Sequence, residues 1–413
     1  MSYPLHRAAV AVLSLGAAIV GARVLPTEQF SALMAAAFLA KFMQILNLGA
    51  TAGYFVSRYS GDGWLQDDAP GAERHFLLGL LVQMAGLGLL VLGVAGLWLT
   101  EYRTGAVAFL LMVPLFVLEP LLRYRRNFSF SLAPEATLAL ALITAMLASQ
   151  SGTTTSALPL IYLCAVALCV LIAITVPLRR LVGTWRSRAC TPFTAGDYGQ
   201  VLLSGGPVYL GTALFLVASS MDRLLLPLYG TDEQISVYFL AQQLSVGSMI
   251  FVTAINFVNT VNLGEARKGP TSVDRALVVD KLRRAALVAG ASYSVLMAGT
   301  VLLETVFLPE NFDGLSWIVL LLGAGMAFFS TAGAITPIVA YFRRQIPLTV
   351  SMGAVALALA ANNAWVYLSG HGEILLAAGT ALALTVQAYF ATWFTFAVLS
   401  DQTKTTRPVG AHQ

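Results

Sequence analysis

Long uncharged runs constrain the fold of this chain more than any other feature of its sequence. A helix needs roughly 20 apolar residues to cross the hydrocarbon core of a bilayer, and each run is about that long or longer. The runs are Phe76–Thr100, Thr137–Leu178, Tyr198–Met221, Gln234–Gly264, Ala285–Leu303, Gly314–Phe342, Gln345–Gly372 and Ile374–Ser400. Charged residues make up 11% of the chain, against about 25% in soluble domains. Because the runs are continuous rather than alternating, a β-barrel is excluded, and we predict an all-α polytopic membrane protein.

Polar turns divide the apolar sequence into about twelve predicted transmembrane helices. They cover roughly residues 4–23, 31–57, 76–100, 104–124, 132–149, 157–178, 199–222, 233–262, 282–307, 314–341, 347–369 and 374–399. The first also resembles a signal peptide, since Arg7 precedes an apolar stretch that ends in small residues. We interpret it as an uncleaved helix because its Arg23 end is repeated later in the chain.

The positions of the basic residues predict how the helices are oriented. Cytoplasmic loops of membrane proteins carry an excess of Lys and Arg. With both termini in the cytoplasm, every Lys and Arg falls on the inner side except Lys41, inside a span, and Arg23, Arg103 and Arg223, in outer turns. The net charge of +4 is therefore a topology signal, and no nucleic-acid partner is expected.

A short sequence motif near the start of the chain is repeated in its second half. Arg23-Val-Leu-Pro26 resembles Arg223-Leu-Leu-Leu-Pro227, and Glu28-Gln-Phe-Ser31 resembles Glu233-Gln-Ile-Ser236. The longest charged connector, 179–197, divides six predicted helices from six. An even number starts both halves on the same side of the membrane, which predicts two parallel repeats around a central cavity. The predicted domains are an N-terminal six-helix bundle at 1–185, a C-terminal six-helix bundle at 186–400 and a cytoplasmic tail at 401–413.

Two predicted helices carry a polar face. In the span 31–57, Lys41, Gln44, Asn47 and Thr51 are spaced by three and four residues, which aligns them on one side of a helix. The span 233–262 carries a longer stripe: Gln242, Ser245, Ser248, Asn256, Asn259 and Thr260. Later spans add Asn362, Asn363 and Gln387. Such groups either tie transmembrane helices together or line a polar cavity, and the length of the second stripe favours a cavity.

Charged residues in or near the spans are further candidates for a functional site. Lys41 lies too deep to reach the interface, and an intramembrane cation marks a functional site by default, so we expect it to face the cavity. Glu119 either pairs with Arg123 near the interface or takes part in proton coupling. The outer rim holds Arg23, Asp222 and Arg223, as gate-forming groups or as interfacial anchors. Only Glu119 and Asp222 are candidate carboxylates for ion coupling.

Metal and cofactor chemistry find no support in the sequence. Cys164 and Cys169 lie in one predicted span and Cys190 in the connector, without metal-ligand spacing, and the four His are scattered. No catalytic or nucleotide-binding motif is present in the sequence. We therefore expect no cofactor, no bound metal and no enzymatic activity.

The order of several motifs resembles the oligosaccharide flippases of bacterial polysaccharide export, in the superfamily of the MATE exporters and the lipid II flippases. The matching stretches are "ARVLPTEQFSALMAAAFLAKFMQILNLGATAGYFVSR", "SGGPVYLGTALFLVASSMDRLLLPLYG", "ISVYFLAQQL" and the basic cluster in "LLRYRRNFSF". The resemblance covers the whole chain. The sequence departs from the family pattern at Pro26-Thr27, where Gly-Pro is common, and at Ser31, where Gly is usual.

The resemblance implies a function. Family members move an isoprenyl-diphosphate-linked oligosaccharide from the inner to the outer leaflet of the bacterial inner membrane, and Lys41 would bind the diphosphate. The expected partners are that glycan carrier, membrane lipid, and candidate polymerase and export machinery. Two alternatives remain. A MATE-like exporter coupled to H⁺ or Na⁺ would need a carboxylate deep in a bundle, and a membrane enzyme would need a large outer loop, whereas the predicted outer loops are short.

Overall fold

The chain folds into two compact helical units. The computed structural model describes residues 2–51, 53–54, 70–98, 102–125, 127–186, 194–218, 220–256, 259, 275–341, 344, 346–369 and 372–405. The first unit comprises Met1–Leu216 and Leu226–Phe239, and the second comprises Val217–Leu225 and Leu240–Gln413. The predicted domains at 1–185 and 186–400 stay a prediction.

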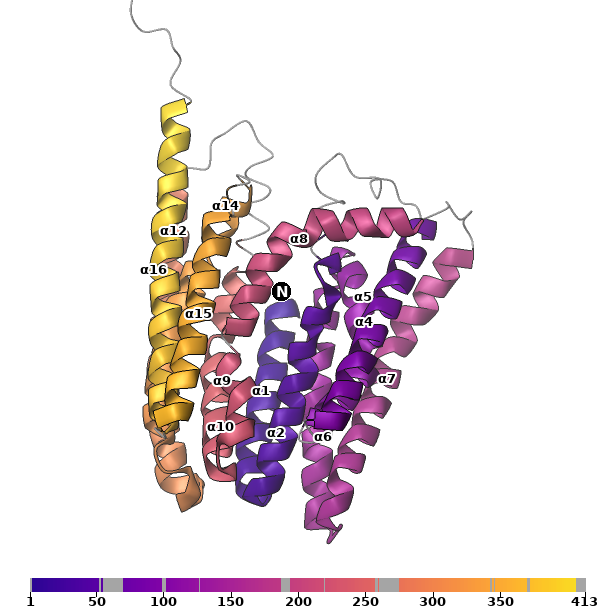
Figure 1. Cartoon of the computed structure of the whole chain (residues 1–413), viewed down its shortest axis with the longest axis vertical. Helices are drawn as coiled ribbons and strands as arrows, with labels where there is room; N and C mark the ends of the chain where they lie inside the picture. Colours follow the sequence, from indigo (N-terminus) through magenta and orange to yellow (C-terminus); the bar gives the residue numbers. More distant parts are fainter. Residues whose placement is uncertain are drawn as a thin grey trace, which may run out of the picture. The chain divides into compact units, whose positions relative to one another are not determined.

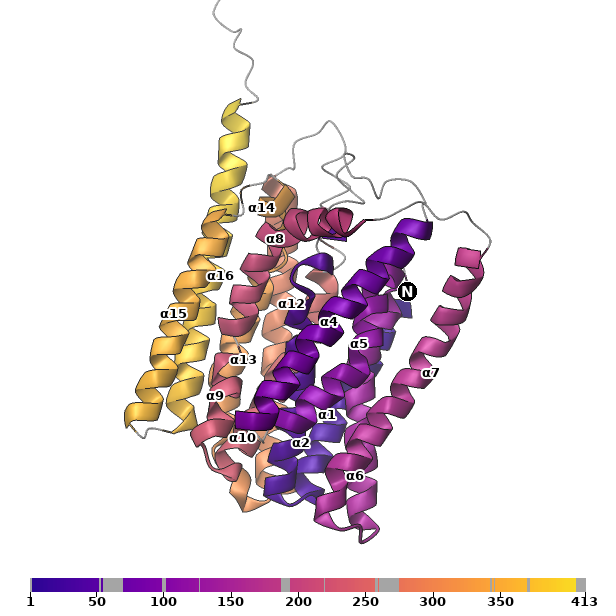
Figure 2. The ribbon, with the colours of Figure 1, turned by 45° about the vertical axis from the view of Figure 1, so that its right-hand side comes forward.

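The first unit is a bundle of long helices (Figure 1). Its elements are α1 (Ser2–Val24), α2 (Thr27–Phe42), the 3₁₀ turn η1 (Met43–Asn47), α4 (Pro70–Trp98), α5 (Arg103–Tyr124), η3 (Phe128–Leu132), α6 (Ala133–Gln150), η4 (Thr155–Ala157), α7 (Leu158–Arg186) and most of α8 (Ala195–Ala218). α5 packs against α2, α4 and α7, and α6 packs against α1 and α7 (Figure 2). Large side chains fill the interior, where Phe30, Phe109 and Tyr162 are fully buried.

The second unit contains the later helices. Its elements are the start of α9 (Met221–Tyr229), the second half of α10 (Asp232–Ser248), α12 (Arg275–Leu302), the π-helical turn η5 (Leu303–Phe307), η6 (Glu310–Phe312), α13 (Leu315–Ala332), α14 (Pro337–Tyr341), α15 (Ile346–Ser369) and α16 (Glu373–Thr405). α13 packs against α12 and α16, and α16 also packs against α15. Glu304 of η5 caps the start of α13, because its carboxylate accepts hydrogen bonds from the N–H groups of Gly314 and Ser316.

Many of the helices are long and apolar enough to cross a membrane. Nine in the described part of the chain meet this condition, and a tenth span results if α10 and the helical residues after it count as one. The predicted twelve also include the shorter apolar segment Ala9–Val24 and the segment 199–222, which α8 and α9 occupy. Large apolar side chains such as Leu90, Leu171 and Ile172 are exposed, as expected of helices that face lipid. The predicted class, an all-α polytopic membrane protein, is confirmed.

The second helix of the first repeat is broken, and the predicted continuous helix at 31–57 was wrong in this respect. α2 ends at Phe42, η1 follows, and Leu48 and Gly49 adopt positive φ angles of 48° and 87°. Asn47 stabilises the break, because its side-chain oxygen accepts from the Gly49 N–H at 2.9 Å while its amide donates to the Gln44 carbonyl at 3.0 Å. Asn side chains compete with helical hydrogen bonds in this way, and Gly tolerates the left-handed backbone.

The second helix of the second repeat is interrupted at a comparable place. The segments Asp232–Gly247 and Ile250–Asn256 meet at an angle of 45°, so the predicted helix at 233–262 is bent rather than straight. α2 runs for 16 residues before its break, and α10 runs for 17. Interrupted helices in corresponding positions of two repeats mark binding sites in many membrane proteins.

Candidate functional site

Lys41 lies in the last turn of α2, immediately before the break. Its ammonium Nζ is 3.7 Å from Oε1 of Glu135 on α6, and the two side chains are 53% and 30% exposed. Glu135 lies within the predicted span 132–149 but was not among the predicted site residues. Which carboxylates take part in ion coupling stays a prediction. The cavity contact of Lys41 stays a prediction.

Gln44 extends the polar contacts of Lys41 by one helical turn. Its Nε2 donates a hydrogen bond of 3.0 Å to Oε2 of Glu119 on α5. Lys41 and Gln44 therefore join the end of α2 and the start of η1 to two different carboxylates, on α6 and on α5. The alternative pairing of Glu119 with Arg123 cannot be assigned, because the Arg123 side chain lies outside the described residues.

Neighbouring helices satisfy the carbonyl groups that the break releases. The hydroxyl of Tyr209 on α8 donates to the Ile45 carbonyl at 2.8 Å. Gln83 of α4 donates to the Leu46 carbonyl at 2.8 Å, and the hydroxyl of Tyr198 on α8 donates to Oε1 of Gln83 at 2.8 Å. Unsatisfied backbone groups are costly at membrane depth, so this network explains how a broken helix persists there.

None of the three side chains in this network was predicted. In the sequence, Gln83 is a single amide in the apolar run Phe76–Thr100, and Tyr198 and Tyr209 lie at the start of another run. A lone amide in a long apolar run was the available signal. Its partners could not be found, because only the fold brings α4 and α8 to the break.

Close backbone packing brings α8 to the broken segment. A Cβ atom at Gly205 would overlap the Gly49 carbonyl and the Gly53 N–H, and a Cβ atom at Gly53 would overlap the Val201 carbonyl. Small residues of this kind allow transmembrane helices to approach closely. The two glycines thus place the tyrosines of α8 within reach of the released carbonyls.

The two copies of the repeated sequence motif, at the starts of α2 and α10, contact each other. Ser31 Oγ donates to Asp232 Oδ1 at 3.0 Å, and Ser236 Oγ donates to the Thr27 carbonyl at 3.3 Å. When the two copies are aligned, Ser31 corresponds to Ser236 and Thr27 to Asp232. Each serine therefore bonds the start of the other repeat's second helix, a reciprocal arrangement typical of a two-fold axis. Ser31 and Ser236 are called the outer serine pair below.

The predicted polar stripe of α10 begins inside the second unit. Gln242 is buried, and within the described residues neither its Oε1 nor its Nε2 has a hydrogen-bond partner. Ser245 is also buried, and its hydroxyl donates to the Ala241 carbonyl one turn earlier. On α16, the buried Gln387 likewise has both amide atoms without a partner in the described part of the chain. Buried amides of this kind are costly unless they bind something.

The end of the stripe joins helices to one another. Asn256 Nδ2 donates to the Ser330 carbonyl of α13 at 2.6 Å, and Asn259 Oδ1 accepts from Lys281 Nζ of α12 at 2.8 Å. These contacts match the helix-joining alternative for both asparagines. The cavity-lining role predicted for the stripe therefore rests on Gln242.

Asp222, one of the predicted rim residues, is buried. Its side chain is 1% exposed, Thr380 Oγ1 donates to its Oδ2 at 3.3 Å, and Arg223 Nε lies 3.9 Å from its Oδ1. Whether Asp222 forms a gate or anchors the helix end stays a prediction. Arg23, by contrast, is exposed at the end of α1. Among the described residues, no group of three His, Cys, Asp or Glu side chains is arranged to hold a metal ion.

Comparison with known proteins identifies the fold. The sequence matches no family model, and no curated protein is significantly similar to it. The lipid II flippase MurJ in its inward closed conformation has a TM-score of 0.64 at 13% identity, covering 99% of this chain and 93% of that one. An outward-facing multidrug resistance MATE family transporter of the MOP superfamily has a TM-score of 0.60 at 14% identity, with 98% and 95% coverage. A MOP superfamily transporter from Pyrococcus furiosus has a TM-score of 0.58 at 14% identity, covering 96% of this chain and 94% of that one. The chain therefore has the fold shared by these membrane proteins.

Proposed function

We propose that this protein is a flippase of the MOP superfamily that moves isoprenyl-diphosphate-linked oligosaccharide units across the bacterial inner membrane by alternating access. The units would serve the synthesis of O-antigen, capsule or exopolysaccharide. The observation that carries the proposal is the Lys41–Glu135 pair beside the broken helix. A diphosphate cannot enter hydrocarbon unaided, and Lys41 is a cation placed inside a predicted span. A fold shared with a lipid II flippase supports a lipid-linked substrate.

The geometry of the Lys41–Glu135 ion pair would allow Lys41 to exchange Glu135 for a diphosphate. At 3.7 Å and with half of the Lys41 side chain exposed, the interaction with Glu135 contributes at most about 1 kcal/mol. A diphosphate offers more negative charge and stronger charge-assisted hydrogen bonds, so it displaces Glu135 from the ammonium. Removal of the negative charge in a Glu135→Gln variant would release Lys41 in the same way. Glu119, which accepts a hydrogen bond from Gln44, is the second carboxylate that couples protons to this step.

The proposal also includes the orientation of the chain in the membrane and the molecules with which it interacts. Both termini lie in the cytoplasm, so the broken helix receives its substrate from the inner leaflet, and the buried amides of Gln242 and Gln387 suit sugar hydroxyls. The carrier lipid, the surrounding membrane lipid, and a polysaccharide polymerase with its export machinery are the partners this role requires.

A MATE-like exporter is the second candidate. Two carboxylates, Glu119 and Glu135, accept polar contacts from the α2–η1 segment within the bundle, which suits ion coupling. The fold is also that of MATE transporters. The two functions differ in substrate: the exporter moves a soluble small molecule, and the flippase moves a lipid headgroup between leaflets.

The test is transport by the purified chain in proteoliposomes that contain a fluorescent isoprenyl-diphosphate oligosaccharide. Leaflet exchange is followed by quenching with a membrane-impermeant reductant. We expect Lys41→Arg to keep substantial transport, Lys41→Gln to lose it, and Lys41→Glu to be worst because two carboxylates then face the phosphates. Lys404→Gln, in the predicted tail, is the matched control. Transport at the wild-type rate by Lys41→Gln would remove the proposed role of the cation, and no exchange by the wild-type chain would favour the exporter.

A further inference from the structure

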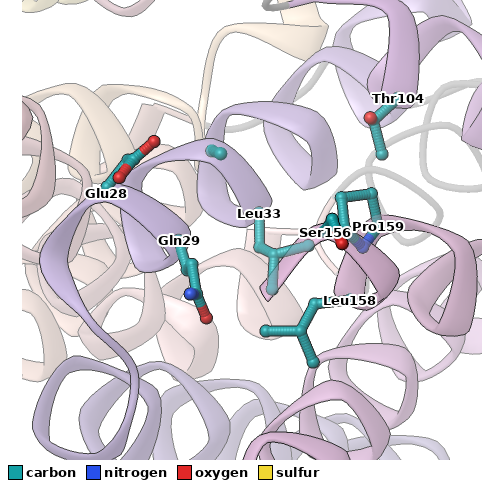
Figure 3. A pocket seen from close by; sticks show the side chains of 8 residues that line it. Glu28, Gln29, Leu33, Thr104, Ser156, Leu158 and Pro159 are labelled. Atoms are coloured by element: carbon teal, nitrogen blue, oxygen red, sulfur yellow. The ribbon is translucent and has the colours of Figure 1, made fainter. Parts of the chain in front are cut away.

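A pocket lies at the starts of three helices of the first unit, away from the break. Its volume is about 290 Å³, and Figure 3 shows the side chains that line it. The lining residues are Glu28, Gln29, Ala32 and Leu33 of α2, Thr104 of α5, Ser156 of η4, and Leu158 and Pro159 of α7. None of them belongs to the site around Lys41.

The predicted orientation of the chain puts this pocket at the outer surface. α2 begins after the turn at Pro26, α5 begins at Arg103, and α7 follows the hairpin that contains Ser156. The positive-inside pattern assigns all three connections to the outer side. A glycan that has crossed the membrane emerges on this side.

The lining is polar on one part and apolar on another. Gln29 Oε1 is buried and has no hydrogen-bond partner in the described part of the chain, while Thr104 and Ser156 add hydroxyl groups. Leu33 and Leu158 are buried and, with Pro159, form the apolar part. Hydroxyls accept and donate, whereas the amide oxygen of Gln29 and the carboxylate of Glu28 only accept. The pocket therefore suits a ligand with several hydroxyl donors and an apolar face.

The local charge favours an uncharged ligand. Each helix start carries a partial positive charge, and the carboxylate of Glu28 in the first turn of α2 opposes it. A phosphate would meet this carboxylate at close range and be repelled. The pocket is also at the lower end of the usual range for ligand sites, about 300–1,000 Å³, which limits the ligand to a small ring rather than a whole oligosaccharide.

We propose that this pocket binds a single sugar unit of the translocated glycan at the outer surface. The proposal rests on the proposed function for the source of the sugar, but the site itself is defined by its lining residues. The hydroxyl groups of the sugar donate to Glu28 and Gln29, and its apolar C–H face packs on Leu33, Leu158 and Pro159. Such a site holds the headgroup briefly after it leaves the cavity and so disfavours its return.

Saturation-transfer NMR on the full-length protein in lipid nanodiscs tests the site, with a panel of methyl glycosides as probes. We expect saturation transfer to at least one glycoside from the wild-type chain. Ala32→Trp should fill the pocket and abolish the signal, because Ala32 is an exposed residue of α2 that lines the pocket. Glu28→Gln should weaken binding by about fivefold through loss of a charge-assisted hydrogen bond. Ala9→Trp, at an exposed position of α1, is the matched control and should leave the signal unchanged.

Additional measurements distinguish a sugar site from a site for phosphate or for a lipid headgroup. An unchanged signal in Ala32→Trp, and in a second pocket-filling variant, Ser156→Trp, overturns the proposal, as does competition by inorganic phosphate. Hydroxyl donors could also come from a lipid headgroup, so the nanodiscs are made with phosphatidylglycerol and, separately, with phosphatidylcholine. Loss of the glycoside signal only in phosphatidylglycerol would assign the pocket to lipid instead of glycan.

The experiments distinguish a wrong assignment of the pocket from a wrong assignment of the flippase function. The proteoliposome assay measures translocation without reference to this pocket, and the glycoside signal measures the pocket without translocation. A chain that translocates the carrier but shows no glycoside signal refutes the pocket alone. A chain that binds glycosides but translocates no carrier refutes the flippase function and the glycan as the source of the sugar.

Discussion

The outer serine pair predicts how strongly the outer end of the protein is held closed. In the proposed alternating-access cycle, an outward-open state would separate the starts of α2 and α10 and break the Ser31–Asp232 and Ser236–Thr27 hydrogen bonds. A hydrogen bond to a charged group contributes about 1.5–3 kcal/mol. The single hydroxyl proton of Ser31 is shared between Asp232 and the Glu28 carbonyl of its own helix, 2.9 Å away, and it donates to that carbonyl alone when the ends separate. The bond to Asp232 therefore favours the closed state by only about 1 kcal/mol.

The variant Ser31→Ala should accordingly raise the ratio of open to closed molecules about fivefold, since 1.4 kcal/mol corresponds to a factor of about ten. Ser236→Ala should raise it by a smaller factor, because its bond is longer, at 3.3 Å, and its acceptor is uncharged. The ratio is measured by electron–electron double resonance between spin labels at Pro26 and Thr231, two exposed positions that directly precede α2 and α10.

The control for this measurement is Ser351→Ala, which removes a hydroxyl that donates to the Leu348 carbonyl of its own helix. It should leave the distance distribution unchanged. If Ser31→Ala gives the same distribution as Ser351→Ala, the outer serine pair does not hold the closed state. The closure would then have to come from apolar packing between the two helices.

Three other predictions follow from the packing, the charges and the topology. Gly205→Ala should lower the stability by about 1–3 kcal/mol because its Cβ overlaps backbone, whereas Gly206→Ala meets nothing within 4 Å and should be neutral in thermal unfolding. Asp222→Ala should impair transport at normal protein abundance because Thr380 loses its acceptor; wild-type transport would identify Asp222 as an anchor only. Cys190, which lies outside the described residues, should react with a membrane-impermeant maleimide in inside-out vesicles but not in intact cells, and labelling from outside would contradict the predicted topology.

The sequence was sufficient for the class of fold, because membrane-spanning helices depend on the local property of continuous apolarity. It did not reveal the break after Phe42. The signal for the break was Asn47-Leu-Gly49, a short polar and flexible interval, and the apolar residues on either side of it read as one helix. A turn of this kind is stable only when other elements satisfy its carbonyls, and that depends on α4 and α8.

The candidate site was predicted in part. Lys41 and Gln44 were found because their spacing places them on one helical face, which is a local pattern. Glu135 was missed because it lies near the start of its predicted span, next to Pro134, where an acidic residue is common at a helix N-terminus. Asn256 and Asn259 matched the right pattern, but the pattern could not distinguish cavity lining from the contacts to α12 and α13 that the structure contains.

The way the chain is shared between the two units limits how the protein can be divided genetically. The chain passes from one unit to the other after Leu216, after Leu225 and after Phe239. A gene split at the connector near 185 would therefore encode a first fragment without residues 226–239, which carry Asp232 and Ser236 of the outer serine pair. The first unit is therefore divided between the two fragments, whereas the second fragment contains the whole second unit together with residues 186–216 and 226–239 of the first. We expect the first fragment to accumulate only when both fragments are co-expressed, so that a reporter fusion to the isolated first half is a poor guide to its folding.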